Sequence, residues 1–294
     1  MSAKMKLPIF IKLHQAPNSL NMLGKMPEVR ANGINIYYRV QGKGEPLVLI
    51  MGLGAECGDW ILQACAFKRY YRVVTFDNRG VGKSDKPSEP YTVKTMADDT
   101  VGLMDHLGID KAHILGVSMG GMIAQEVAIN YPERVRKLIL VSTNAGREEK
   151  GRHSPELLRA IGLKEDFSDE DIKAVDIGKV MASLNAHAFS GGAIKTVAVP
   201  FCWVRTKLFG IKGVKGQFEA VMTHSTLDRL HTIKAPTLVI AGTEDRIVPA
   251  SSSDVLANKI PDARLVKVEG GSHTLVAEKR GRFNREVLDF LRGR

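Results

Sequence analysis

Residues 114–124, ILGVSMGGMIA, decide how the rest of the chain is interpreted, because they place a serine between glycines where an apolar run becomes helix-like. The apolar run predicts a strand over 112–117, and the residues after the serine predict a helix over 119–131. The pattern Gly-x-Ser-x-Gly, which holds a serine on a strained strand-to-helix turn, is filled by Gly116, Ser118 and Gly120. Only glycine lets the strand and the helix pack closely on either side. The pattern also occurs by chance, so its position between a strand and a helix is what makes Ser118 a candidate nucleophile.

Further apolar runs alternate with helix-like segments along most of the chain. Strands are predicted over 28–40, 46–51, 71–76, 135–141, 237–241 and 263–268. Helices are predicted over 92–107, 251–259 and 282–291. Continuous apolar runs are typical of strands buried on both faces of a parallel sheet, whereas the alternating first run is typical of an antiparallel edge. The alternation predicts an α/β domain with a mostly parallel central sheet flanked by helices.

One segment, 147–225, interrupts this alternation with helix-like pieces over 155–163 and 168–189 and a loop region over 210–216. A chain of 294 residues with 44% hydrophobic residues can bury one large core. We therefore predict one α/β core with a helical insertion. The predicted parts are an N-terminal extension (1–26), a core (27–146 and 226–294) and the insertion (147–225).

The charge and the cysteines exclude several other classes of protein. The formal net charge is +10, but the lysines and arginines are scattered and form no basic stripe with interleaved aromatics. We expect a solvated basic surface, with no nucleic acid and no membrane as partner. The three cysteines, Cys57, Cys65 and Cys202, are odd in number and lack Cys-x-x-Cys spacing. They predict neither a disulfide framework nor a zinc site, and we expect all three to be small buried residues.

The first 26 residues are basic, and their longest apolar run, 7–11, is interrupted by Pro8. This run is too short for a signal-peptide core or a membrane span. We expect a flexible extension or an edge feature. Since no later run approaches about 18 apolar residues, we expect a cytoplasmic protein.

Two glycine-rich loops offer rival interpretations. Gly52, Gly54 and Gly58 follow an apolar strand, and Asp77 closes the next one, as in a dinucleotide-binding fold. The third glycine is one residue late for that fingerprint. The run 77–84, DNRGVGKS, ends like a phosphate loop, but Asp77 stands where the first glycine should be, and its carboxylate would repel phosphate. Both interpretations are therefore discounted.

A serine hydroxyl becomes nucleophilic only when a base takes its proton, and that base needs a carboxylate to orient it. Among the eight histidines, His273 alone lies in a glycine-containing turn after a predicted strand, where loop residues reach the active edge of a sheet. Asp245 directly follows the strand 237–241 and is favoured over the neighbouring Glu244 as the orienting acid. The order serine, acid, histidine distinguishes this set from the orders found in chymotrypsin and subtilisin.

From about residue 28 onward the chain resembles the α/β-hydrolase family. The run 77–84 resembles the family's Asp-x-Arg-Gly-x-Gly-x-Ser loop, 116–121 matches its Gly-x-Ser-Met-Gly-Gly turn, and 236–249 resembles its acid-bearing segment. Where the family usually has His-Gly after the second core strand, this chain has Met51-Gly52. That departure keeps the backbone donor but removes the side chain expected to brace the loop.

The resemblance implies an α/β-hydrolase fold in which Ser118, Asp245 and His273 act as a triad. It implies an oxyanion hole made by the backbone N–H groups of Leu53 and Met119, and a cap formed by 147–225. A serine nucleophile implies acyl transfer through an acyl-enzyme, with no organic cofactor and no metal.

Several functions share these residues. The favoured one is a carboxylesterase or lactonase whose partner is a small-molecule ester or lactone, of small to medium size and apolar because the insertion is rich in apolar residues. A C–C bond hydrolase of ring-cleavage products, a cofactor-free perhydrolase of the haloperoxidase type and a non-catalytic ligand receptor remain alternatives. A homodimer is left open.

Overall fold

The computed structural model describes residues 27–149, 151, 153–189 and 212–294. Its centre is an eight-stranded sheet in the order β1-β2-β4-β3-β5-β6-β7-β8. Strands β3 to β8 are mutually parallel, and β1 and β2 run antiparallel to their neighbours. The bounds are β1 Glu28–Ala31, β2 Ile34–Gln41, β3 Pro46–Ile50, β4 Arg72–Phe76, β5 Ala112–Val117, β6 Val135–Val141, β7 Thr237–Gly242 and β8 Ala263–Val268. The predicted α/β class with a mostly parallel sheet is confirmed.

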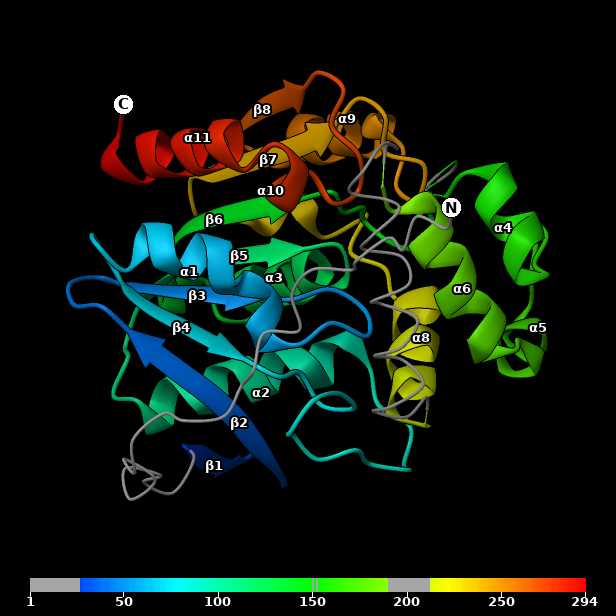
Figure 1. Cartoon of the computed structure of the whole chain (residues 1–294), viewed down its shortest axis with the longest axis horizontal. Coiled ribbons are helices and arrows are strands. Elements are labelled where there is room, and N and C mark those ends of the chain that lie inside the picture. Colours follow the sequence, from blue (N-terminus) through cyan, green and yellow to red (C-terminus); the bar gives the residue numbers. More distant parts are fainter. Residues whose placement is uncertain (1–26, 150, 152, 190–211) are drawn as a thin grey trace, which may run out of the picture.

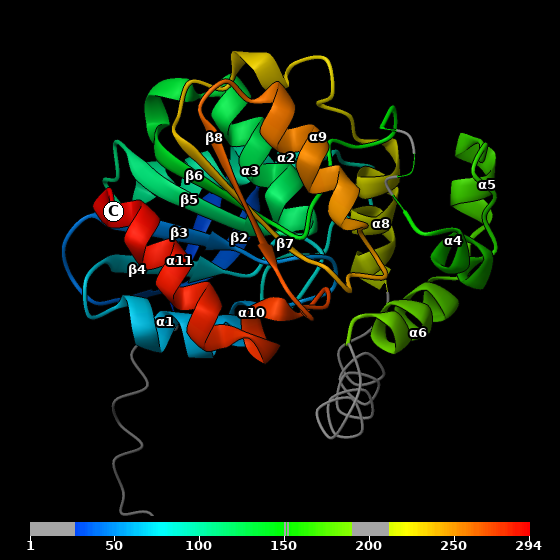
Figure 2. The same ribbon diagram turned by 90° about the horizontal axis from the view of Figure 1, so that it is seen from above.

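Helices cover both faces of the sheet (Figures 1 and 2). On one face lie α2 (Val93–His106), α3 (Met119–Asn130) and α9 (Ala250–Lys259), and on the other α1 (Ile61–Phe67), α10 (Leu275–Glu278) and α11 (Arg280–Arg292). Alternate residues of β3 enter the two cores, so a continuous apolar run is what this strand needs. In the described parts of the chain, no helix is long and apolar enough to cross a bilayer.

The first predicted strand is wrong in one respect, because 28–40 forms a hairpin of β1 and β2. Asn32 and Gly33 make the two-residue turn, with φ angles of 47° and 81°. Asn-Gly favours such turns because both residues tolerate positive φ. The Asn32-Gly33 pair is therefore a turn signal in the sequence, and it divides the predicted strand.

The segment 147–225 contributes helices α4 (Pro155–Ile161), α5 (Asp169–Ala174), α6 (Ile177–His187) and α8 (Lys212–Thr223). The predicted piece 168–189 is divided, because the Asp176 carboxylate accepts the N–H groups of Gly178 and Lys179 and starts a new helix. The loop predicted over 210–216 is wrong from residue 212 on, where α8 begins. Residues 190–211, and with them part of that loop, lie outside the described residues.

The glycines within the predicted loop 210–216 allow α8 to pack closely against the core. A Cβ added at Gly213 would lie 1.9 Å from the carbonyl oxygen of Gly80, and one at Gly216 would lie 2.7 Å from the Tyr91 ring. Glycine lowers helix propensity, yet only glycine lets α8 approach the core this closely. Packing therefore overrides the local signal.

The two ends of this segment meet. Gly146 and Ser225 form an isolated antiparallel bridge, the Arg147 N–H donates to the His224 carbonyl at 2.6 Å, and the Thr226 N–H donates to the Ala145 carbonyl at 2.7 Å. The chain thus leaves and rejoins the α/β core at one point. Both views place α4, α5, α6 and α8 beyond the carboxyl ends of the parallel strands (Figures 1 and 2).

The cysteines are not all buried, contrary to the expectation from the sequence. Cys57 is buried, and burial together with the nearby Asp77 carboxylate raises the pKa of its thiol to about 12. Cys65 is exposed, which corrects the expectation that it is buried. It lies on α1, on the side turned away from the sheet. Cys202 and the N-terminal extension lie outside the described residues.

Candidate active site

Ser118 occupies the turn between β5 and α3, with φ 54° and ψ −122°. A non-glycine residue with positive φ is strained, and such strain persists only where the surroundings hold it. Here the Ser118 N–H donates to the Val141 carbonyl at 2.9 Å, and the Thr143 hydroxyl donates to the Ser118 carbonyl at 2.8 Å. The serine is therefore held in this conformation by the adjacent strand β6 and the loop after it.

The glycines beside this turn have no room for a side chain. A Cβ at Gly116 would lie 2.0 Å from the Gly120 carbonyl oxygen, and a Cβ at Gly120 would lie 2.1 Å from the Ile50 carbonyl oxygen. The strand, the helix and the end of β3 meet at this point. The steric reason given for the Gly-x-Ser-x-Gly pattern is thus confirmed.

His273 and Asp245 come from two neighbouring loops, after β8 and β7. The Nδ1 atom of His273 lies 2.9 Å and 3.1 Å from the two carboxylate oxygens of Asp245. Because an ionised carboxylate only accepts hydrogen bonds, this contact assigns the proton to Nδ1 and leaves Nε2 as an acceptor. The imidazole is thereby set to receive a proton.

The Asp245 side chain is 1% exposed, and its Oδ1 also accepts the N–H groups of Ile247 and Val248, each at 2.9 Å. The neighbouring Glu244 is exposed. The carboxylate of Asp245 is thus held by three donors, which fix its position beside the histidine. Of the two acids, only Asp245 contacts the histidine.

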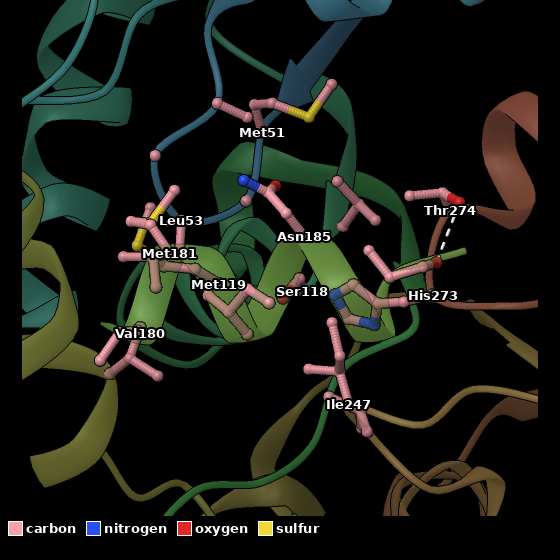
Figure 3. A pocket seen from close by; sticks show the side chains of 18 of the residues that line it. Met51, Leu53, Ser118, Met119, Val180, Met181, Asn185, Ile247, His273 and Thr274 are labelled. Atoms are coloured by element: carbon pink, nitrogen blue, oxygen red, sulfur yellow. Dashed lines mark hydrogen bonds between the residues drawn. The ribbon is translucent and has the colours of Figure 1, made fainter. Parts of the chain in front are cut away.

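Ser118 and His273 line one cavity of about 360 Å³, together with Leu53 and Met119. Figure 3 shows the His273 ring beside Ser118, with Leu53 and Met119 on the far side of the serine. The Asp245 carboxylate contacts the ring from outside this cavity. No hydrogen bond joins Ser118 to His273 among the described contacts, and such bonds commonly form only in the substrate complex.

Both predicted oxyanion donors lie next to Ser118. Met119 is the first residue of α3, so its N–H has no acceptor within the helix and lies at the positive end of the helix dipole. Leu53 lies in the turn formed by residues 52–55, which the Ala55 N–H closes by donating to the Gly52 carbonyl at 3.2 Å. A Cβ at Gly52 would be 3.2 Å from the Ser118 Cβ, so this turn contacts the serine directly. We call residues 52–55 the oxyanion turn.

The oxyanion turn is braced although Met51 replaces the usual histidine. The Asn78 side-chain amide donates to the Met51 carbonyl at 3.0 Å. The Gly54 N–H donates to Oε1 of Gln217 on α8 at 2.9 Å. Neither Asn78 nor Gln217 was given a role from the sequence. Asn78 lies in the 77–84 loop and could have been noticed there, whereas a glutamine in a helix gives no such signal.

The 77–84 loop does not have the form of a phosphate site. One carboxylate oxygen of Asp77 accepts the Lys83 N–H at 2.9 Å, and the other accepts the Cys57 N–H at 2.7 Å. The carboxylate itself therefore occupies the concave side of the loop, where a phosphate would bind. Arg79 points away and forms a buried bidentate pair with Asp99, with both N–O distances at 2.5 Å. The loop is a rigid support for its neighbours.

Helices α4, α6 and α8 supply the wall of the cavity opposite Ser118, which we call the roof. Its residues are mostly apolar: Leu157, Ile161, Val180, Met181, Leu184, Asn185, Phe218, Val221 and Met222. Asn185 on α6 is the exception, and its amide has no hydrogen-bond partner in the described ranges. In Figure 3 it lies close to Ser118 and Met51. Among the described residues, no group of three or more His, Cys, Asp or Glu side chains is arranged to bind a metal.

Comparison with known proteins identifies the family. A family profile described as alpha/beta hydrolase fold matches residues 45–174, and one described as serine aminopeptidase, S33, matches residues 217–280. A relative from Caulobacter sp. (strain K31) is 30% identical over 270 residues, which cover 88% of this chain and 96% of the relative. The chain therefore belongs to the α/β-hydrolase fold family, and it is a hydrolase of that fold.

The relatives carry several names. The Caulobacter protein bears the provisional name carbamate hydrolase RutD. A Synechocystis sp. protein, provisionally named non-heme chloroperoxidase, is 31% identical over 88% of this chain and 95% of its own length. The crystal structure of the enol-lactonase from Burkholderia xenovorans LB400 has a TM-score of 0.77 and 27% identity, covering 90% of this chain and 99% of that one. The family thus allows several substrates on one fold.

Proposed function

We propose that this protein is a serine hydrolase that cleaves carboxylic esters or lactones of small to medium apolar molecules through an acyl-enzyme. One observation carries the proposal. Ser118, in a strained turn, shares a cavity with His273, whose Nδ1 is held by the buried Asp245. This arrangement supports a nucleophile, a base and an orienting acid acting as one unit.

In the first half of the reaction, His273 Nε2 takes the proton of Ser118 Oγ as Oγ bonds to the substrate's carbonyl carbon. The carbonyl oxygen becomes an oxyanion and accepts the N–H groups of Leu53 and Met119. His273 then gives its proton to the leaving alkoxide as the C–O bond breaks. In a lactone the resulting alcohol stays attached to the acyl group.

In the second half, water attacks the acyl-enzyme while His273 Nε2 takes its proton. The second tetrahedral intermediate collapses, the carboxylic acid leaves, and His273 returns the proton to Ser118 Oγ. The Asp245 carboxylate stabilises the imidazolium in both halves and remains ionised throughout.

The roof supports an apolar substrate. Apart from Asn185 its residues are aliphatic, aromatic or thioether side chains, and no lysine or arginine is among the described residues that line the cavity. Lys215 on α8 is exposed and lies outside the lining. Lys195, Arg205 and Lys207 lie outside the described residues. We therefore propose that 147–225 acts as a cap that selects by size and apolar character.

Asn185 adds one polar contact to this selection. Its carboxamide, which has no hydrogen-bond partner among the described residues, lies in the cavity with Ser118, so it can both donate a hydrogen bond to a substrate and accept one from it. We propose that a favoured substrate carries a second polar group, such as an amide, a hydroxyl or a ring carbonyl, near the scissile carbonyl. A purely hydrocarbon acyl chain would leave this amide unpaired.

The alternatives use the same residues on other substrates. The name of the Synechocystis relative favours a perhydrolase as the second candidate, since water and hydrogen peroxide can both attack an acyl-enzyme. A C–C bond hydrolase and a non-catalytic receptor remain open.

A substrate panel tests these candidates. It contains p-nitrophenyl esters, lactones, a vinylogous diketone, and acetate with hydrogen peroxide, each measured with wild type and with Ser118→Ala. Ester or lactone turnover that disappears in Ser118→Ala supports the proposal. If only the diketone is turned over, the protein is a C–C bond hydrolase. If only acetate with hydrogen peroxide is turned over, it is a perhydrolase. Ligand binding without turnover of any of these identifies a receptor.

A further inference from the structure

Gln217, on α8, is a buried polar side chain that the mechanism above does not use. It is 0% exposed. Its Oε1 accepts the N–H of Gly54 at 2.9 Å, and its Nε2 donates to the carbonyl of Arg79 at 2.8 Å. Since one end faces a donor and the other an acceptor, only one orientation of the amide satisfies both contacts. A single side chain therefore joins the oxyanion turn to the 77–84 loop.

The 77–84 side of this bridge is fixed. Arg79 is held by the buried bidentate pair with Asp99. The Asp77 carboxylate closes the loop by accepting the N–H groups of Cys57 and Lys83. Through Gln217, a rigid loop sets the position of the Gly54 N–H.

Helix α8 is also docked tightly at this point. Gly213 packs against Gly80, where a Cβ would lie 1.9 Å from the Gly80 carbonyl oxygen. The Tyr91 hydroxyl donates to the Gly213 carbonyl at 3.1 Å, and burial raises the pKa of Tyr91, so this donor stays protonated. Gln217 lies one helical turn further along α8. Its amide is thus presented to the oxyanion turn from a fixed base.

The contact falls on the middle peptide of the oxyanion turn. Gly54 has φ +70°, as the third residue of a type II turn does. The peptide between Leu53 and Gly54 is the middle peptide of this turn, and glycine permits it to rotate. The Gln217 Oε1 accepts the N–H of that peptide. It therefore fixes the peptide that directly follows Leu53, the residue whose own N–H is the predicted oxyanion donor.

We propose that Gln217 is a positioning residue that keeps the Leu53 N–H directed at the oxyanion. Gln217 supplies this bracing from the insertion, because α8 belongs to the segment 147–225. The inference rests on the proposed function, because it concerns the hole that stabilises the tetrahedral intermediate. It also makes the oxyanion hole depend on how 147–225 docks on the core.

The test uses Gln217→Met, which keeps the length of the side chain and removes both hydrogen bonds. Active sites are counted by titration, and kcat and KM are measured with a p-nitrophenyl ester. An oxyanion donor acts in the transition state, so kcat should fall by about 10- to 100-fold with KM within about three-fold of wild type. The Ki of an arylboronic acid, whose tetrahedral adduct on Ser118 occupies the hole, should rise by a similar factor.

Tyr91→Phe is the matched control, since it removes a different hydrogen bond between α8 and the core without touching the oxyanion turn. Its kcat and its boronate Ki should stay within about two-fold of wild type. If Tyr91→Phe loses as much activity as Gln217→Met, only the docking of α8 matters and the positioning role is refuted. Wild-type kcat and Ki in Gln217→Met refute it directly.

A second variant, Gln217→Asn, decides the question if the methionine variant does not fold. Its side chain stays polar but is one methylene too short to reach both loops. If Gln217 is a positioning residue, this variant should show the same loss in kcat and in boronate affinity. Retention of both would overturn the inference. The wild-type measurement separates the positioning role of Gln217 from the proposed function. An active wild type with unaffected Gln217 variants refutes the positioning role alone, whereas an inactive wild type that binds no boronate refutes the proposed function as well.

Discussion

The turn at Ser118 and the roof face each other across one cavity, yet they are specified in different ways. At the turn, backbone contacts leave no room for a Cβ at Gly116 or Gly120, so only glycine fits these two positions. In the roof, apolar side chains from three helices fill space, and several residue types would serve equally well. The comparison teaches that the proposed chemistry depends on local steric constraints, whereas substrate choice depends on packing between distant segments.

The first prediction tests the turn side of this comparison and has the largest expected effect. Ser118→Ala and His273→Ala should each lower kcat by about a million-fold, because residues that act as one unit fail together. The double variant should be hardly worse than either single one. Ester hydrolysis measured with purified variants checks this, with circular dichroism as the control for folding. Retention of most activity by either single variant would show that the turn does not carry the chemistry.

The second prediction concerns the orientation of the histidine. In Asp245→Asn, the remaining side-chain oxygen can still accept the N–H groups of Ile247 and Val248, so the fold should persist. The new NH₂ group would face His273 and favour the wrong tautomer, lowering kcat by about ten-thousand-fold.

Glu244→Gln is the matched control, because Glu244 is adjacent in sequence but exposed. It should leave kcat within about two-fold of wild type. The opposite ranking of the two variants would transfer the orienting role to Glu244.

The sequence predicts the turn at Ser118 better than it predicts the contacts of the insertion. The glycines at the turn, and the loop positions of Asp245 and His273, were predictable because each leaves a local signal. The hairpin turn at Asn32 and Gly33 also has a local signal, because Asn-Gly favours positive φ at both positions.

Gln217 left no such signal. Its partners Gly54 and Arg79 lie 163 and 138 residues away in the chain, and a helical glutamine normally faces solvent. Gly213 and Gly216 gave a misleading signal, since their reason lies in tertiary contacts with Gly80 and Tyr91. Bracing and docking across the insertion could not be predicted because they depend on segments that meet only after folding.

The third prediction tests whether the apolar roof selects substrates by the length of their acyl chain. Across acetyl to dodecanoyl p-nitrophenyl esters, each methylene that fits should raise kcat/KM by about ten-fold until the cavity is full. Leu184→Phe narrows the roof and should shift the maximum to shorter chains. Leu62→Phe, at an exposed position on α1, is the control and should leave the profile unchanged. A flat profile, or a preference for anionic substrates, would show that the apolar lining does not select.

The smallest expected effect concerns Asn185. Asn185→Leu should lower kcat/KM by about ten-fold for a lactone that carries an amide next to the ring, because one hydrogen bond is lost. For the unsubstituted lactone it should leave kcat/KM equal or slightly raised. Ser183 lies on the same helix but outside the cavity lining. Ser183→Ala should therefore have the wild-type kcat/KM for both lactones. An equal loss for both substrates would mean that Asn185 serves the roof's packing and not recognition.

The central claim is that Ser118 is an activated nucleophile, and covalent labelling tests it most directly. Wild-type protein is incubated with a fluorophosphonate, and the adduct is located by mass spectrometry of the intact protein and its peptides. The account predicts a single adduct on Ser118, absent from Ser118→Ala and formed far more slowly in His273→Ala. An unlabelled wild type, or a label on another residue that persists in Ser118→Ala, would contradict it.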